Sequence, residues 1–207
     1  MKCATPPKLK NVTAAGYMKK IGLPLAAICL LLASCTSKTK KHFAFTALGH
    51  EQTGLDFTNK LTAYPDFNLF KYMYYYNGAG VGAGDFNNDG LADVFFSGNT
   101  VQNKLYLNKG KLKFEDITDK AGVAGNGTWS TGVSIADVNA DGLLDIYVCH
   151  SGKLPPEKLV NELFINEGVP AGSPNGAPRF INKAKEYGLD AVGTQSTQAA
   201  FFDYDLD

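Results

Sequence analysis

Two nine-residue stretches of this chain, residues 85–93 and 137–145, share the pattern D-x-N-x-D-G-x-x-D. Each places three carboxylates close together, and their mutual repulsion would destabilise a fold unless a cation neutralised it. Oxygen atoms at positions 1, 3, 5 and 9, with a backbone carbonyl at position 7, form the hard and flexible shell that Ca²⁺ prefers. The glycine at position 6 lets the backbone turn sharply. A plain surface turn is the alternative, because Asx and Gly favour turns anyway, but the complete spacing occurs twice.

The pattern assigns the expected calcium ligands residue by residue. A third copy begins near residue 203, and it has Asp at the position where the other copies have Asn, which still supplies oxygen. The predicted ligands are Asp85, Asn87, Asp89, Leu91 (carbonyl) and Asp93; Asp137, Asn139, Asp141, Leu143 (carbonyl) and Asp145; and Asp203, Asp205 and Asp207.

The sequence on either side of the loops indicates which kind of calcium site they form. An EF-hand requires flanking helices and a Glu at position 12, but Phe96 and Val148 stand there. Both residues belong to apolar runs that read as strands, and short runs of small and apolar residues also precede each loop. We therefore expect each ion to bind in the loop that joins the two strands of a β-hairpin.

The repeat extends beyond the loops. Residues 103–110 return as 161–168, and residues 114–123 return loosely as 180–189, so each unit has about four short strands. The first Asp of each loop recurs after 52 and then 66 residues, and a loop rich in Pro and Gly accounts for the longer interval. Four strands per unit at this period is typical of a β-propeller blade.

With these features, residues 43–207 resemble FG-GAP repeats, also called VCBS-type repeats, which form the calcium-loop blades of integrin alpha-chain propellers. Residues 76–90 are similar to the propeller of bacterial surface lipoproteins related to cartilage acidic protein. The resemblance implies an all-β fold of four-stranded antiparallel blades, with Ca²⁺ bound by the side chains named above.

A closed propeller needs about 4–8 blades, which leads us to expect that these residues are part of a longer chain, truncated at the C-terminus. Two nearly complete units are predicted at 79–119 and 131–185, followed by the opening strand of a third. Segments near 43–46 and 54–58 are predicted as outer strands of another blade.

The N-terminal region has the features of a lipoprotein signal. A basic start at Met18, an apolar stretch and the lipobox-like Leu32-Ala33-Ser34-Cys35 follow one another. The 14 residues before Cys35 are too few to span about 30 Å of hydrocarbon as a helix. We therefore predict a signal region at 1–35, lipidation of Cys35 and a polar tether at 36–42. The expected location is the bacterial cell envelope, at the outer membrane or cell surface, with the lipid anchor holding the protein to the membrane.

Charge and cysteine content narrow the classes of partner. Loss of the leader removes five of the 20 basic residues, which leaves 15 against 20 acidic residues and a net charge of −5. Nucleic acid is therefore not an expected partner. Among the four cysteines, Cys149 alone is neither removed with the leader nor acylated, so no internal disulfide is expected. We predict that Cys149 belongs to the core.

Patterns of catalytic residues are missing from the sequence. The histidines His42, His50 and His150 have no metal-ligand spacing, and neither G-x-S-x-G nor H-E-x-x-H occurs. Cys149 and His150 are neighbours in a predicted strand and point to opposite faces. Carboxylates that bind Ca²⁺ are poor proton carriers because their pKa is depressed. No catalytic residue and no enzyme activity is predicted.

Aromatic residues leave two interpretations open. Tyr72–Tyr76 can stack on sugars or line a partner surface, or they can form a half-buried strand entering the first blade, which we favour. For Trp129 we favour packing between blades over ligand stacking. Two functions follow: a non-catalytic calcium-stabilised propeller that presents loops to a protein or glycan, or the N-terminal part of a propeller enzyme acting on polysaccharide.

Overall fold

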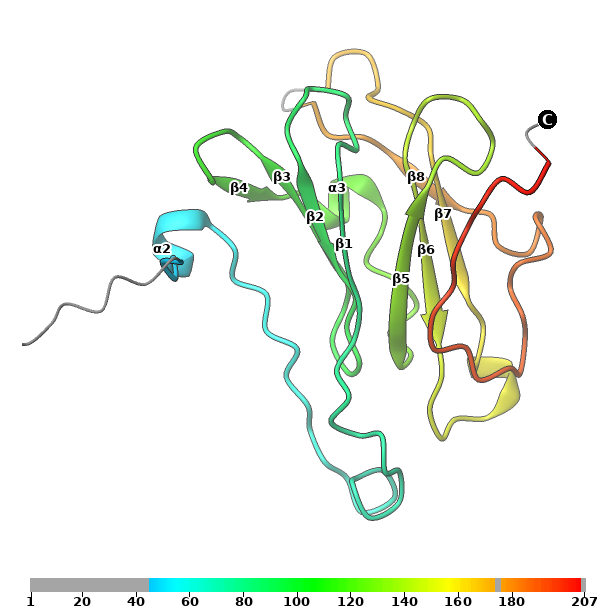
Figure 1. The fold of residues 1–207 in the computed structure, drawn as a ribbon. Coiled ribbons are helices and arrows are strands. Elements are labelled where there is room, and N and C mark those ends of the chain that lie inside the picture. Colours follow the sequence, from blue (N-terminus) through cyan, green and yellow to red (C-terminus); the bar gives the residue numbers. More distant parts are fainter. Residues whose placement is uncertain (1–44, 174–175, 206–207) are drawn as a thin grey trace, which may run out of the picture. The chain divides into compact units, whose positions relative to one another are not determined.

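Two four-stranded antiparallel sheets make up most of the regular structure in the computed structural model, which describes residues 45–173 and 176–205 (Figure 1). In both sheets the strands lie side by side in chain order. This confirms the all-β fold class with four-stranded antiparallel blades. The strands are β1 (Val81–Gly84), β2 (Asp93–Phe96), β3 (Lys104–Asn108) and β4 (Phe114–Asp116) in the first sheet, and β5 (Ser130–Ala136), β6 (Asp145–His150), β7 (Glu162–Asn166) and β8 (Phe180–Asn182) in the second.

The chain divides into two units, Met1–Thr46 and Ala47–Asp207. In the first unit the structure describes Phe45 and Thr46, and both are exposed. The predicted signal region, the lipobox with Cys35, the tether at 36–42, His42 and Asp207 lie outside the described residues. The fold below is that of the second unit.

The predicted calcium loops occupy equivalent places in the two sheets. The β1–β2 pairing ends at Gly84 opposite Asp93, and the β5–β6 pairing ends at Ala136 opposite Asp145. Each Asp/Asn loop therefore closes a β-hairpin, as expected.

Helices in the described residues are short. They are α2 (His50–Thr53), α3 (Thr118–Ala121) and the 3₁₀ helix η1 (Pro156–Lys158). Among the described residues, none has the length and apolar character needed to cross a membrane.

Strand β6 supplies side chains to two hydrophobic clusters, and alternate residues go to opposite faces. Ile146 and Val148 pack into the cluster that also contains residues of the first blade, such as Phe95. Tyr147 and Cys149 pack into the second cluster. Cys149 is buried as predicted, and burial raises the pKa of its thiol to about 11.

Glycines let β1 approach β5 closely, and the two strands are in contact. A Cβ at Gly82 would lie 2.7 Å from Ile135 Cδ1, and one at Gly80 would lie 2.7 Å from the backbone nitrogen of Val133. Because side chains alternate along a strand, these glycines share the face of β1 that meets the second blade. The glycine-rich sequence before the first loop therefore sets the distance between the blades.

The prediction of a strand at 54–58 is wrong. This segment follows α2 and has no strand partner among the described residues. Its side chains attach it to the first blade instead, since Asp56 Oδ1 accepts a hydrogen bond from Tyr106 Oη at 2.5 Å and Phe57 stacks on Phe96 with 5.0 Å between ring centroids. Residues 45 and 46 are not in a strand either.

The prediction of a strand at Tyr72–Tyr76 is also wrong, because the backbone there forms successive turns. The amide of Tyr75 donates to the carbonyl of Tyr72 at 3.0 Å, and that of Asn77 donates to Tyr74 at 3.1 Å. Packing of the aromatic rings explains this, since Tyr75 lies 5.3 Å from Trp129 between ring centroids and is buried.

The opening strand predicted for a third unit is not formed as a strand. Residues 196–199 lie along β5 and are held mainly by side chains, with Thr131 Oγ1 donating to the carbonyl of Ser196 at 2.7 Å and Gln198 Nε2 donating to that of Val133 at 3.1 Å. In the two formed blades the corresponding strand is paired with the strand that follows its loop, and no such partner follows Asp203 in the described residues.

Three buried polar side chains lie close together in the second sheet. His150 Nε2 is 3.5 Å from Glu162 Oε2 and 3.3 Å from Ser130 Oγ, and all three residues are buried. Burial lowers the pKa of His150 to about 4 and raises the pKa of Glu162 to about 7. His150 is therefore neutral at pH 7, and the two side chains do not form an ion pair.

Gly80→Ala is expected to destabilise the protein by roughly 1–3 kcal/mol, because the new Cβ would overlap backbone atoms that cannot rotate away. Those atoms are Val133 N at 2.7 Å and Thr131 O at 2.8 Å. Chemical denaturation measures the change. Ala83→Val is the control, since Ala83 is an exposed residue of β1, the strand that directly follows Gly80, and it should stay within about 0.5 kcal/mol of wild type. Equal effects of the two substitutions would contradict the packing argument.

Glu162→Gln is expected to change how stability depends on pH. The pKa of Glu162 is raised from 4.5 to about 7 in the folded state, so its contribution is complete below pH 4.5 and is lost as pH rises to about 7. The variant, which cannot ionise, should become more stable than wild type across this window by roughly 1–3 kcal/mol. Denaturation between pH 4.5 and 8 tests this, with the exposed Glu157→Gln as control. A stability difference that does not vary with pH would refute the assignment.

Candidate functional site

The two Asp/Asn loops have the same backbone geometry. Position 6 has a left-handed conformation in both, with φ of 85° at Gly90 and at Gly142, as the sequence predicted. Position 4 is also left-handed, with φ of 56° at Asn88 and 57° at Ala140. Asn tolerates this conformation but Ala does not favour it, so the loop shape is imposed by its hydrogen bonds.

In each loop the carboxylate of the Asp at position 1 accepts hydrogen bonds from the backbone N–H groups of positions 5 and 6. Asp85 accepts hydrogen bonds from the backbone N–H groups of Asp89 at 3.0 Å and Gly90 at 2.7 Å. Asp137 accepts the equivalent pair from Asp141 at 3.1 Å and Gly142 at 2.8 Å. These bonds bring positions 1 and 5 to the same side of the loop.

The Asp at position 9 is buried in both blades. Asp93 accepts hydrogen bonds from the backbone N–H groups of Phe86 at 3.0 Å and Asn108 at 2.8 Å. Asp145 does the same with Val138 at 2.9 Å and Asn166 at 2.8 Å. Each carboxylate thus joins the start of the loop to the end of the third strand of its blade.

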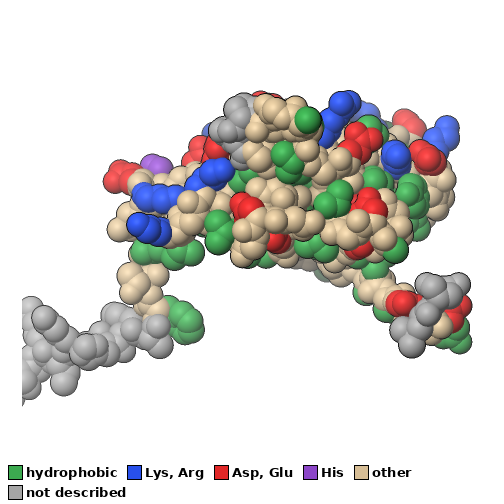
Figure 2. Space-filling model, turned by 90° about the horizontal axis from the view of Figure 1, so that it is seen from above, with side chains coloured by type: hydrophobic (Ala, Val, Ile, Leu, Met, Phe, Trp, Pro, Cys, Tyr) green, Lys and Arg blue, Asp and Glu red, His purple; other side chains and the backbone are tan. Residues whose placement is uncertain are grey.

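Electrostatics in the loops favour a cation. Burial raises the pKa of Asp93 to about 6, and repulsion from Asp89 and Asp85 adds to the shift, while two backbone hydrogen bonds oppose it. Burial likewise raises the pKa of Asp145. Figure 2 looks onto the end of the molecule where the loops lie and shows acidic side chains exposed there.

The side chains match a hard cation in chemistry, although they do not yet surround one point. Asn87 Oδ1 is buried and has no hydrogen-bond partner, while its Nδ2 donates to Asp89 Oδ2 at 3.0 Å. Carboxylate oxygens that already accept one N–H retain a second lone pair. Within residues 45–173 and 176–205, no three His, Cys, Asp or Glu side chains converge closely enough to hold a metal ion. The oxygen atoms at positions 1, 3 and 5 are of the chemical type that Ca²⁺ prefers. The carboxylate at position 9 instead accepts two backbone hydrogen bonds within its blade.

The other predicted ligands are the carbonyl groups of Leu91 and Leu143 and the Asp residues of the third copy. Leu91 and Leu143 donate their backbone N–H groups to the Asp at position 5, each at 2.9 Å. Asp203 and Asp205 are exposed, and Asp207 lies outside the described residues. The structure therefore places the side chains at positions 1, 3 and 5 near one another in the first two loops, although they do not converge on one point.

Asn108 and Asn166 are site residues that the sequence analysis did not single out. Besides donating its backbone N–H to the Asp at position 9, each Asn donates its side-chain amide to the carbonyl before that Asp, at 3.0 Å to Ala92 and 3.2 Å to Leu144. Their recurrence at equivalent places in residues 103–110 and 161–168 was a usable signal.

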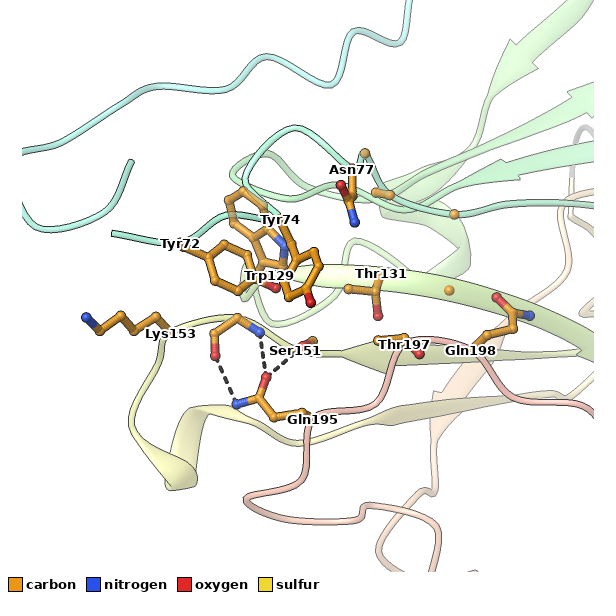
Figure 3. Close-up of a pocket in the computed structure, with 15 residues that line it drawn as sticks. Tyr72, Tyr74, Asn77, Trp129, Thr131, Ser151, Lys153, Gln195, Thr197 and Gln198 are labelled. Atoms are coloured by element: carbon orange, nitrogen blue, oxygen red, sulfur yellow. Dashed lines mark hydrogen bonds between the residues drawn. The ribbon is translucent and has the colours of Figure 1, made fainter. Parts of the chain in front are cut away.

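A cavity of about 810 Å³ lies at the opposite ends of the same strands (Figure 3). It is bordered by the chain before β1, the start of β5, the chain after β6 and residues 195–198. Tyr72, Tyr74 and Trp129 contribute aromatic surface, so the interpretation set aside for the tyrosine run returns. Trp129 is 3% exposed and packs against Phe67, Tyr72 and Tyr75. Its main role is therefore packing, but against the chain before β1 and not between the blades as predicted.

Comparison with known proteins agrees with the repeat architecture. The profile of the FG-GAP-like repeat family matches residues 85–148, from the first residue of the first loop into β6. Cartilage acidic protein 1 of Xenopus tropicalis is 36% identical over 72 residues, which is 35% of this chain and 11% of that protein. The chain thus matches a short part of that relative's length. Residues 85–148 are thus similar to FG-GAP-like repeats, and the two four-stranded antiparallel sheets are consistent with blades of an incomplete β-propeller.

Proposed function

We propose that this protein is a non-catalytic, calcium-binding β-propeller of a bacterial cell-envelope lipoprotein, and that it presents a surface for binding a protein or a glycan. The observation that carries the proposal is the matching backbone geometry of the two loops. In each, the Asp at position 1 accepts the backbone N–H of position 5, and the Asn at position 3 donates its side-chain amide to the Asp at position 5, beside a left-handed glycine.

A structural role for Ca²⁺ follows from where the loops lie. Each loop closes a hairpin between the first two strands of a blade, and its acidic groups repel one another when no cation is bound. A bound Ca²⁺ would stabilise the charged carboxylates and with them the hairpin. Asp85, Asn87 and Asp89, and the equivalent Asp137, Asn139 and Asp141, would hold it.

A binding role is supported by the cavity and by the state of the acid–base groups. The His150, Glu162 and Ser130 side chains are buried, and Ser130 Oγ and Glu162 Oε2 both face the same nitrogen of His150. A catalytic triad requires the acid and the nucleophile on opposite ring nitrogens. This group therefore supports the fold, and we assign no catalytic role to it.

Removal of calcium is expected to lower the melting temperature, and millimolar Ca²⁺ should restore it. Extracellular calcium modules bind with Kd of about 10⁻⁴–10⁻³ M, so a free concentration of 100 times Kd would stabilise each site by about 2.7 kcal/mol. Asp89→Ala and Asp141→Ala should each lose about half of the calcium-dependent gain. Thermal denaturation with EDTA and with added Ca²⁺ measures this.

Asp66→Ala is the control for the loop variants, because Asp66 is exposed and lies outside both loops. It should keep the full calcium response. A folded protein whose melting temperature ignores both EDTA and Ca²⁺ would refute the calcium assignment.

Lipid anchoring rests on the sequence at residues 32–35. Cells grown with labelled palmitate should label the wild-type protein, and Cys35→Ser should abolish the label, because the modified thiol would be lost. Cys149→Ser is the matched control and should retain the label, since that thiol is buried. A Cys35→Ser protein that still carries the label would exclude the lipobox.

A further inference from the structure

We propose that the cavity of about 810 Å³ bordered by Tyr74, Asn77, Trp129 and Gln198 binds a neutral saccharide. The proposal rests on the binding role given above and names the site and the chemical class of ligand. A cavity of this volume falls within the range of about 300–1,000 Å³ that is usual for ligand sites.

An aromatic side chain is available for stacking at this cavity. Tyr74 is 52% exposed, and its ring centroid lies 5.7 Å from that of Tyr72 in an edge-to-face arrangement. This arrangement leaves a face of Tyr74 uncovered by Tyr72. Aromatic faces pack against the apolar C–H surface of a sugar ring, while the phenolic hydroxyl remains available for hydrogen bonds. Figure 3 shows the Tyr74 ring beside Thr131 at the cavity.

Neutral polar groups surround this ring. Within the described residues, the Asn77 amide and the Thr197 hydroxyl have no side-chain hydrogen bond. Figure 3 shows Asn77 on the side opposite Thr197 and Gln198. Amides and hydroxyls both donate and accept hydrogen bonds, as the hydroxyl groups of a sugar require.

The opposite wall is fixed before a ligand arrives. Gln195 Oε1 accepts hydrogen bonds from Ser151 Oγ at 2.7 Å and from Gly152 N at 3.0 Å, and its Nε2 donates to Gly152 O at 3.1 Å. Gln198 Nε2 donates to the backbone carbonyl of Val133 at 3.1 Å. Rigid polar groups reduce the entropy that binding would otherwise cost.

Charge around the cavity indicates an uncharged ligand. Lys153 is the charged residue among those that border it, and Figure 3 shows its side chain extending away from the other labelled residues. No carboxylate borders the cavity in the described part of the chain. A basic ligand would find no opposite charge at the cavity, and an acidic ligand would find only Lys153, whose side chain extends away from the other labelled residues.

A saccharide is favoured over a peptide for a structural reason. Peptides that add to a sheet need an unpaired strand edge, but residues 196–199 already lie against β5 at this place, through Thr131 and Gln198. What the cavity offers is an aromatic face with side-chain amides and hydroxyls around it.

Trp129 is the single tryptophan of the chain and borders the cavity, so its fluorescence reports binding. The full chain in calcium is titrated with neutral hexasaccharides of β-1,4-glucose, α-1,4-glucose, β-1,4-xylose and β-1,4-N-acetylglucosamine. Saturable binding of at least one, with Kd below about 5 mM, is expected. Tyr74→Ala should raise Kd by about tenfold and Asn77→Ala by a few fold, whereas Tyr74→Phe, which keeps the ring, should stay within about threefold.

Two control variants locate the signal. Tyr76→Ala removes an exposed tyrosine of the same segment that does not border the cavity. Lys158→Ala alters a second cavity of about 500 Å³ that also touches Trp129. Both should bind the sugar as wild type does. A sugar response lost in either control, but not in Tyr74→Ala, would overturn the assignment.

The remaining outcomes are also decisive. The proposal fails if no hexasaccharide binds, if a polygalacturonate hexasaccharide binds more tightly than every neutral one, or if a pool of neutral decapeptides saturates the signal and the sugars do not. Failure here with an intact calcium response would leave the calcium-stabilised propeller standing. Sugar binding without any calcium response would refute the calcium assignment alone.

Discussion

The buried carboxylate at position 9 of each loop is the interaction on which the rest of each blade depends. Asp93 receives one N–H from the start of its loop and another from Asn108 at the end of β3. A buried carboxylate without such partners would be costly. By binding both, it fixes the hairpin loop, the second strand and the third strand at one point. Asp145 repeats this in the second blade, with Val138 and Asn166 as its partners.

Local sequence predicted the features that local chemistry determines. The glycine at position 6 needs a left-handed conformation wherever this loop forms, so Gly90 and Gly142 were predictable. The strands on either side followed from their apolar runs. The role of Asn108 was not predictable, because it depends on β3 lying beside a loop whose Asp is 15 residues earlier in the chain. Repetition pointed to the residue, but only the sheet shows its partner.

The mistaken strand predictions have a common physical cause. Segments 54–58 and 72–76 have the aromatic and apolar composition of strands, yet a strand forms only where a second backbone offers hydrogen bonds. In both segments an aromatic ring packs against another ring instead. Phe57 stacks on Phe96, and Tyr75 packs against Trp129. The chain before β1 therefore covers the blades with side chains instead of adding to a sheet. In this arrangement Tyr74 is exposed beside the cavity.

The loops and the cavity lie at opposite ends of the same strands, and this limits how they can influence each other. Strand β5 begins beside the cavity at Ser130 and ends at Ala136, directly before the second loop. Asp137 follows Thr131 by six positions along extended chain, which corresponds to roughly 20 Å. A cation in the loop would therefore not touch a ligand in the cavity. Its effect on binding would pass through the hairpins, whose far ends carry the Gly78–Gly80 and Ser151–Lys153 walls. Calcium and ligand would then be coupled through the population of folded blades, because each stabilises the same folded state.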